Sequence, residues 1–310
     1  MNVGALISVF SLGLVCLVSG QSFAGPSTLA FDGQRAMALL EELTAIGQRY
    51  PGAKDRDSAI RRLSTYLSDA GAAVTLEPFE SISPIDGKTY PFHNIVARFQ
   101  PSRPQRILLG THFDTRSVGD LDASPKRRKE PIPGANDGTS GVAVLLELAR
   151  HLPKLLEEKR WGVDIVLFDA EDLGTRSELS GFSRGAKFFA KRLSQKQVDA
   201  YLGAVIVDMV GERDLVLKRE SYSLQRAETL TNLIWRYGQA RSKETFTMVK
   251  GGGVIDDHLP LLERGIPATL LIDLDYPQWH TASDKPEYCS ARSLDIVGDT
   301  LEAYLRDLNI

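Results

Sequence analysis

The chain has 310 residues, 43% of them hydrophobic and 25% charged, an ordinary globular composition with enough apolar side chains for a sizeable core. Its formal net charge at pH 7 is −3, so neither nucleic acid nor an anionic membrane surface is expected as a partner. The length fits one large α/β domain better than two small ones, and we assign that domain to residues 32–310.

The N-terminus has the pattern of a secretory signal peptide, which we assign to residues 1–24. Val3–Val18 is a nearly unbroken apolar run, shorter than the roughly 20 residues that a membrane-spanning helix needs. It leads to Ser22-Phe23-Ala24, a small-x-small pattern typical of a cleavage site, although the usual positive charge at the start is missing. We expect a secreted or periplasmic protein that is free of the membrane after cleavage; an uncleaved anchor is the alternative.

The two cysteines give little support to a disulfide. Cleavage would remove Cys16, which also lacks the small preceding residue that a lipoprotein site requires. The mature chain would then keep Cys289 alone, so no internal disulfide could form. We therefore expect the exported domain to be held together by its core.

Helical and strand-like patterns alternate along the chain. Apolar residues recur at helical spacing in Asp32–Gln48 and Asp55–Ala70, and Gly71 ends the second helix. The loop Arg116–Pro133, whose basic cluster we interpret as solvated, has a length that is often functional. Ser140 is expected to cap the helix that it begins. The other predicted elements are strands at Val74–Phe79, Asn94–Phe99, Arg106–Gly110, Val163–Ala170, Tyr201–Val210 and Ala268–Ile272, and helices at Ser140–Leu152, Gly185–Leu193, Gln225–Tyr237, Asp257–Glu263 and Ser293–Leu308.

This alternation predicts an α/β fold in which helices cover both faces of a mostly parallel sheet. Chemically active side chains follow four of the predicted strands, and one more lies in the Gly-rich turn "PGANDGTSG". In an open α/β sheet, the loops beyond the carboxyl ends of the strands converge on one crevice. The residues expected there are His112, Asp114, Asp137, Glu171, Asp172, Asp208 and His280.

Zinc binds through nitrogen and oxygen donors of the kind that five of these residues carry. A catalytic zinc needs three protein ligands and an open position, so the crevice has more donors than one ion requires. The surplus fits either a second metal or acid–base groups around a single one. The five donors are His112, Asp137, Asp172, Asp208 and His280.

Each donor also has a structural explanation when it is taken alone. Asp137 is in a position to form a turn or cap a helix, and Glu171-Asp172 has the appearance of a solvated acidic pair. His112 and Asp114 are spaced for a simple hydrogen bond, although the same pairing orients the imidazole ring in metal sites. The joint occurrence of these groups at one end of the sheet favours the metal site.

Several motifs in this order resemble the zinc-dependent aminopeptidase family of the leucyl-aminopeptidase type: "THFDT", "GANDGTSGVAVLLELAR", "VLFDAED", "IVDM" and "WHTASD". Within that family, "FHNIVARF", "GGVIDDHLPLLERGIP" and the aromatic-led "PQWHT" most resemble the animal-type glutaminyl cyclases. The resemblance covers about residue 32 to the C-terminus. It implies a three-layer α/β/α sandwich on a twisted, mixed, mostly parallel sheet.

The resemblance also implies roles for individual residues. In the cyclases one zinc is held by positions that match Asp137, Asp172 and His280 here. The acid–base glutamate matches Glu171, and the tryptophan of the substrate pocket matches Trp279. The supporting carboxylates match Asp208 and Asp256. In the two-metal aminopeptidases, His112 and Asp208 would also bind metal, with Asp137 bridging the two ions.

The implied activity is conversion of N-terminal glutaminyl residues to pyroglutamate with release of ammonia, with one zinc ion as cofactor. The implied partners are peptide or protein N-termini that begin with Gln, and the enzyme is expected to be a monomer. The alternative is a two-zinc aminopeptidase.

Three features depart from the family pattern. The usual Glu-Glu pair is Glu171-Asp172, one methylene shorter at the metal-binding position; the strand before Trp279 has no histidine; and the disulfide of many animal cyclases is absent.

Overall fold

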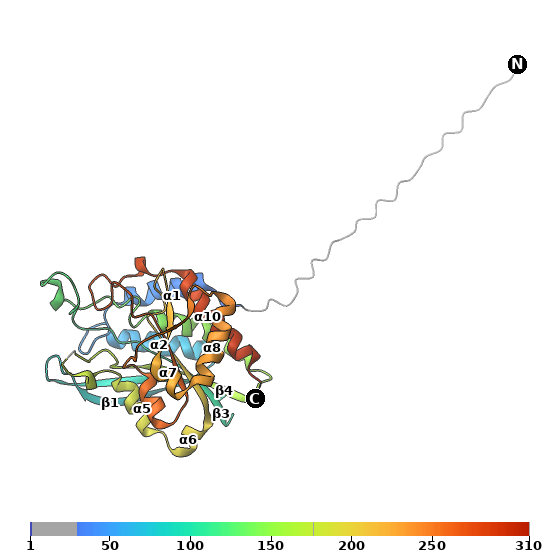
Figure 1. The fold of residues 1–310 in the computed structure, drawn as a ribbon, viewed down its shortest axis with the longest axis horizontal. Coiled ribbons are helices and arrows are strands. Elements are labelled where there is room, and N and C mark those ends of the chain that lie inside the picture. Colours follow the sequence, from blue (N-terminus) through green and yellow to red (C-terminus); the bar gives the residue numbers. More distant parts are fainter. Residues whose placement is uncertain (2–29, 176, 310) are drawn as a thin grey trace.

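The protein is described by a computed structural model that covers Met1, residues 30–175 and residues 177–309 (Figure 1). The predicted signal peptide, residues 1–24, lies almost wholly outside these described residues and stays a prediction. None of the described helices is both long enough and apolar enough to span a membrane.

A six-stranded mixed sheet is the central element, with its strands in the order β1-β2-β4-β3-β5-β8. The pairs β1/β2 and β2/β4 are antiparallel, whereas β4, β3, β5 and β8 are joined by parallel pairs. Every residue of β4 and β8 is buried, which accounts for their almost continuous apolar sequence. The strands are β1 Ala73–Ile82, β2 Thr89–Phe99, β3 Gln105–His112, β4 Trp161–Phe168, β5 Tyr201–Asp208 and β8 Ala268–Ile272.

Helices cover both faces of this sheet. Because side chains alternate along a strand, Ile107 and Leu109 of β3 join one hydrophobic cluster and Leu108 joins the other. The predicted three-layer α/β/α sandwich is thereby confirmed. The first cluster includes residues of α1 Gly33–Ile46, α2 Arg56–Asp69, α3 Ser140–Ala149, α4 Leu152–Leu155, α8 Glu228–Arg241 and α10 Ala291–Asp307, and the second includes residues of α5 Arg184–Arg192, α6 Gln195–Ala200 and α9 His258–Arg264.

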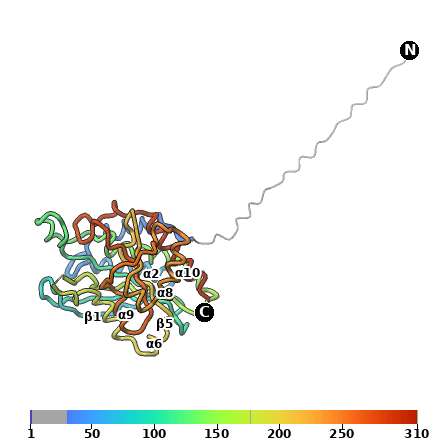
Figure 2. The backbone as a smooth tube through the Cα atoms, viewed as in Figure 1, coloured from blue at the N-terminus to red at the C-terminus, as the bar shows by residue number. Residues whose placement is uncertain are grey.

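The first and last helices of the described domain lie side by side, α1 in blue and α10 in red (Figures 1 and 2). The backbone N–H of Phe31 donates to the Glu302 carboxylate at 2.8 Å, and that of Gly33 donates to Asp295 at 3.0 Å. These hydrogen bonds attach the start of the domain to its last helix.

Two predictions of local structure are wrong. Ser140 is the first residue of α3, not its cap, because its hydroxyl donates back to the Asn136 carbonyl at 2.6 Å and accepts the N–H of Val210 at 3.1 Å. The predicted helix Gln225–Tyr237 begins at the wrong residue. The backbone leaves the helical region at Ala227, which separates α7 Ser221–Arg226 from α8.

A small second sheet was not predicted. It pairs β6 Leu217–Arg219 with β7 Phe246–Lys250 in parallel. Both strands are short, and most of β7 is exposed, so neither carries a clear pattern of burial in its sequence. Single 3-10 turns occur at Arg127–Lys129, Leu179–Gly181 and Pro286–Tyr288.

Candidate active site

The predicted site residues lie together beyond the carboxyl ends of the parallel strands. His112 is the last residue of β3, and Asp208 is the last residue of β5. The others lie in the loops after β4 and β8 and in the turn before α3: Glu171, Asp172, His280 and Asp137. All six are buried in the described structure.

The backbone takes left-handed conformations at three points around this crevice. Ala170 has φ 58°, Met209 has φ 46° and His280 has φ 54°. Residues with a side chain rarely adopt such angles, and they persist only where the surrounding structure holds them. They mark where the chain turns after β4 and β5 and at His280 itself.

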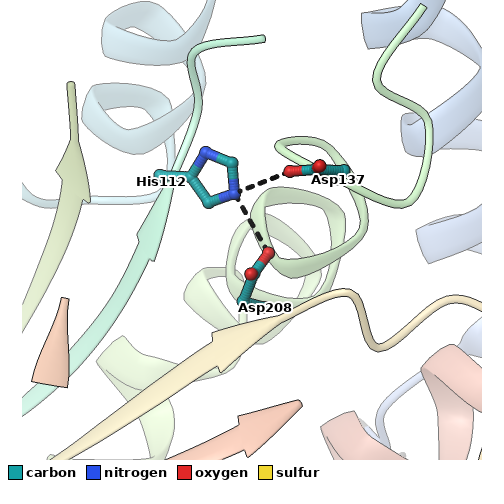
Figure 3. Close-up of side chains that lie close together, drawn as sticks. All are labelled: His112, Asp137 and Asp208. Carbon is teal, nitrogen blue, oxygen red and sulfur yellow. Dashed lines mark hydrogen bonds and ion pairs between the residues drawn. The ribbon is translucent and has the colours of Figure 1, made fainter. Parts of the chain in front are cut away.

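A first group of possible metal ligands consists of His112, Asp137 and Asp208, whose ligand atoms all lie within 4.8 Å of one another. The Nε2 atom of His112 lies 3.0 Å from Asp208 and 3.3 Å from Asp137. Figure 3 marks both contacts with dashed lines. Burial alone would lower the pKa of His112, but Asp208 and the other facing carboxylates raise it well above its usual value.

A second group consists of Asp137, Asp172 and His280, so that Asp137 belongs to both groups. The Nε2 atom of His280 lies 3.4 Å from Asp172 and 3.8 Å from Asp137. The Oδ2 atoms of Asp137 and Asp172 are buried and have no hydrogen-bond partner. Unpaired buried carboxylate oxygens are costly. A cation between these donors would satisfy them, and the oxygen and imidazole donor set fits zinc.

Two further aspartates hold the loops that carry these ligands. The Asp114 carboxylate accepts the backbone N–H groups of Glu171 at 3.0 Å and Asp172 at 3.2 Å. Asp284 accepts those of Asn136 at 2.9 Å and Asp137 at 3.1 Å. Because a backbone N–H bond to a carboxylate fixes main-chain position, these residues set where the ligands lie. Asp284 ends the motif "WHTASD", yet the sequence alone did not suggest this role.

Glu171 is buried, and its carboxylate accepts a hydrogen bond from the Ser183 hydroxyl at 3.2 Å. Burial raises its pKa well above the usual range; His112 opposes this shift, whereas Asp256, Asp257 and Asp172 reinforce it. A carboxyl group in this state holds a proton at pH values where an exposed glutamate would be ionised. It is therefore suited to accepting and donating a proton.

Asp208 and Asp256 also line the crevice. Burial raises the pKa of Asp256 to about 7, and the charge of Asp208 adds to this effect. Burial likewise raises the pKa of Asp208, against the influence of His112. The adjacent Asp257 is fully buried, and neither of its carboxylate oxygens has a hydrogen-bond partner. Like charges thus oppose ionisation throughout this cluster.

The ligands open on a cavity of about 280 Å³. Trp279 lies on its wall, with its ring centroid 4.3 Å from that of His280. Sites for drug-sized ligands begin at roughly 300 Å³, so this cavity suits a small group such as one end of a chain. Its other walls include Leu179, Phe182, Met209, Val254, Ile255, Ile272 and Leu274.

Sequence reasoning missed two charged residues in the long loop after β3. Arg116 is almost completely buried and donates to the Asp172 carboxylate at 2.8 Å. Asp120 lies 3.2 Å from Nδ1 of His280. Burial would raise the pKa of Asp172, but Arg116 and His280 hold it below its usual value. The one available signal was the position of an arginine directly after "THFDT".

Comparisons with known proteins show the family and the fold. Residues 94–305 match the model of peptidase family M28. The glutaminyl-peptide cyclotransferase of Boiga dendrophila is 23% identical over 291 residues, which cover 83% of this chain and 77% of that protein. The crystal structure of Tannerella forsythia glutaminyl cyclase shares 30% identity with a TM-score of 0.83 and covers 91% of this chain and 100% of that one. The crystal structure of a Zn-dependent exopeptidase from Parabacteroides distasonis shares 28% identity with a TM-score of 0.85. It covers 91% of this chain and 100% of that one.

Proposed function

The chain belongs to peptidase family M28, and from that premise we propose that it is a zinc-dependent glutaminyl-peptide cyclotransferase. It would convert an N-terminal glutaminyl residue to pyroglutamate and release ammonia. One observation carries the proposal: Asp137, Asp172 and His280 open on a small cavity whose wall also includes Glu171 and Trp279. The relatives named as cyclotransferases support it over most of the chain.

Asp137, Asp172 and His280 would hold the zinc ion, because they provide three donors with unpaired buried oxygens among them. Bound zinc supplies Lewis-acid polarisation of the side-chain amide oxygen of the substrate. The remaining chemistry belongs to the side chains of this protein. Attacking amine and target carbonyl are parts of one residue, so the site must fold that residue back on itself.

In the proposed reaction, a bond forms between the α-amino nitrogen and the side-chain carbonyl carbon, and the bond from that carbon to the amide nitrogen breaks. Glu171 takes a proton from the α-amine and passes it to the departing nitrogen, which leaves as ammonia. Asp208 and Asp256 would position the amine and stabilise the released ammonia. Trp279 would form an apolar wall that keeps the substrate in a near-attack geometry; such positioning contributes on the order of 7–11 kcal/mol in well-oriented reactions.

An aminopeptidase is the second candidate, and a specific observation favours it. His112, Asp137 and Asp208 form another complete ligand group that shares Asp137 with the first. With a metal in each group, Glu171 would act as the base for an attacking water. In the cyclase, His112 instead stays hydrogen-bonded to Asp208 through Nε2, with Asp137 3.3 Å from the same atom.

One assay tests both candidates. A Gln-initiated peptide is incubated with the purified, zinc-loaded protein, and a matched peptide that begins with Ala serves as the control. The cyclase reading expects the first peptide to lose the mass of ammonia with all its peptide bonds intact, and the control to stay unchanged. Release of the first residue from either peptide supports the aminopeptidase. Metal analysis of the same sample should find one zinc per chain for the cyclase and two for the aminopeptidase.

The protein is further proposed to be exported by its N-terminal signal peptide and to act as a monomeric single domain, residues 32–310, in the periplasm or outside the cell. Its substrates would be peptide or protein N-termini that begin with Gln. N-terminal sequencing of the mature protein tests the export step. A first residue just after Ala24 is expected, and an intact Met1 would contradict it.

A further inference from the structure

A single guanidinium joins two carboxylates beside the proposed zinc ligands. Arg116 donates through Nη1 to Oδ1 of Asp172 at 2.8 Å, and to the backbone carbonyls of Asp172 at 3.2 Å and Gly174 at 3.0 Å. Its Nε and Nη2 donate to the two carboxylate oxygens of Asp120 at 2.7 and 3.1 Å. The rigid, planar guanidinium binds Asp120 through two donors while a third nitrogen holds Asp172, a fixed geometry that the point-like ammonium group of a lysine does not reproduce.

Asp120 continues this network to the second ligand. Its Oδ1 lies 3.2 Å from Nδ1 of His280, while Nε2 of the same ring faces Asp172 at 3.4 Å. An imidazole that binds a metal through one nitrogen typically donates the N–H of the other to a carboxylate, which fixes both the tautomer and the ring orientation. Asp120 occupies the position of that carboxylate for His280.

Arg116 restricts the first ligand in a similar way. It occupies Oδ1 of Asp172, whereas Oδ2 is buried and has no partner. One oxygen is therefore held by the protein, and the other remains for a cation. This matters because Asp172 is one methylene shorter than the glutamate usual at this position, so its carboxylate has less reach to adjust.

We propose that Arg116 and Asp120 form a charged clamp that positions Asp172 and His280 to bind zinc, an inference that rests on the proposed function for the identity of the ligands. Neither clamp residue touches the substrate in this proposal. Both are positioning residues that act through the ligands.

The simpler reading is that these contacts only anchor the loop, and Asp122 allows the two readings to be separated. Asp122 lies two residues from Asp120 in the same loop. It accepts the N–H of Ala282 at 3.2 Å and pairs with Arg127 at 3.3 Å. It thus attaches the loop to the segment that carries His280, but it is not paired with the side chain of either ligand.

The decisive measurement is the zinc dissociation constant of metal-depleted protein, obtained by competition with a chromophoric chelator. Asp120→Ala should weaken zinc binding about 10–100-fold, the usual effect of losing a carboxylate that orients a ligand. Its melting temperature without metal should stay close to that of the wild type. Arg116→Lys should also weaken binding, because lysine does not reproduce the rigid bidentate contact with Asp120 together with the bond to Asp172. Asp122→Ala, the matched control, should bind zinc as the wild type does.

The clamp is refuted if Asp120→Ala binds zinc within threefold of the wild type, or if Asp122→Ala weakens binding as much. If Asp120→Ala does not fold, Arg116→Lys is judged by the same thresholds. Peptide cyclisation is assayed separately on each sample. If the wild type binds zinc but does not cyclise Gln-peptides, the proposed function is refuted. The clamp is then still tested by comparing the zinc dissociation constants of the variants with that of the wild type. A wild type that cyclises, with unchanged affinity in the variants, refutes the clamp alone; a wild type that binds no zinc refutes both.

Discussion

One buried charged cluster lies within the central sheet and another beyond the carboxyl ends of its strands, and the two differ in how completely their polar atoms are paired. Toward the amino ends of the strands, Arg106 donates to Asp164 at 2.7 Å, and the Tyr201 hydroxyl donates to the other oxygen of Asp164 at 2.7 Å. The remaining guanidinium donors of Arg106 reach four backbone carbonyls. This cluster is closed, because each charge has its partner within the protein.

The cluster at the carboxyl ends is open by the same criterion. Asp137, Asp172 and Asp257 keep buried oxygens with no hydrogen-bond partner. Burial and mutual repulsion raise the pKa of Glu171 and Asp256. A fold that can close one buried charge network completely has left another incomplete, and an external cation would complete it. Buried charge alone therefore does not identify a functional site. The cluster at the carboxyl ends differs in that several carboxylates with unpaired buried oxygens lie around one crevice.

The largest expected difference between the clusters is catalytic. Glu171→Gln should lower turnover of a Gln-peptide about 10²–10⁴-fold, because the amide cannot transfer the proton. Zinc content should remain at the wild-type level, since Glu171 is not one of the proposed ligands. The exposed Glu157→Gln variant is the control and should keep full activity. Near-normal turnover by Glu171→Gln would contradict the proton-transfer role.

A substitution in the closed cluster should lower the free energy of unfolding. Asp164→Asn removes the charge that pairs with the buried Arg106, and the loss of one partner from a buried ion pair costs about 3–5 kcal/mol. Urea unfolding measures this loss. The variant should keep wild-type zinc affinity, because Asp164 lies in the first half of β4 and the ligands lie beyond the carboxyl ends of the strands. A large loss of zinc affinity without a loss of stability would show that the two clusters are coupled.

Zinc itself should stabilise the open cluster. At a free concentration 100 times the dissociation constant, zinc should add about 2.7 kcal/mol to the free energy of unfolding, and a chelator should remove that gain. Zinc should add the same amount to the free energy of unfolding of Asp164→Asn, whereas it should add less to that of His280→Ala. An equal gain in His280→Ala would place the bound ion elsewhere.

The last expected difference concerns the pH dependence of stability. Burial raises the folded-state pKa of Asp256 to about 7, above the roughly 3.9 of an unfolded aspartate. The resulting stability is fully present below about pH 4 and is lost as pH rises through about 7. Asp256→Asn should therefore make metal-free protein more stable at pH 8, with little change at pH 4. Equal effects at both pH values would contradict this account.

The sequence predicted best those elements whose apolar residues recur at a regular, short spacing. Apolar runs encode strands such as β4 and β8, and parallel strands bring their carboxyl ends to one edge, so the gathering of His112, Asp172 and His280 followed from the strand pattern. Short, exposed strands such as β6 and β7 carry no such pattern. Local propensity did not anticipate the non-helical backbone of Ala227 between α7 and α8, nor the hydrogen bonds of the Ser140 hydroxyl with Asn136 and Val210.

By itself, then, the sequence determined the α/β class, the donor types and the edge of the sheet where they meet, because these depend on periodicity and on residue chemistry. Only the tertiary structure decided the strand order with β3 between β4 and β5, and the pairing of Arg116 with Asp172 and of Asp120 with His280. Those pairs join residues 56 and 160 positions apart through an irregular loop, and the path of such a loop is set by packing against the rest of the fold.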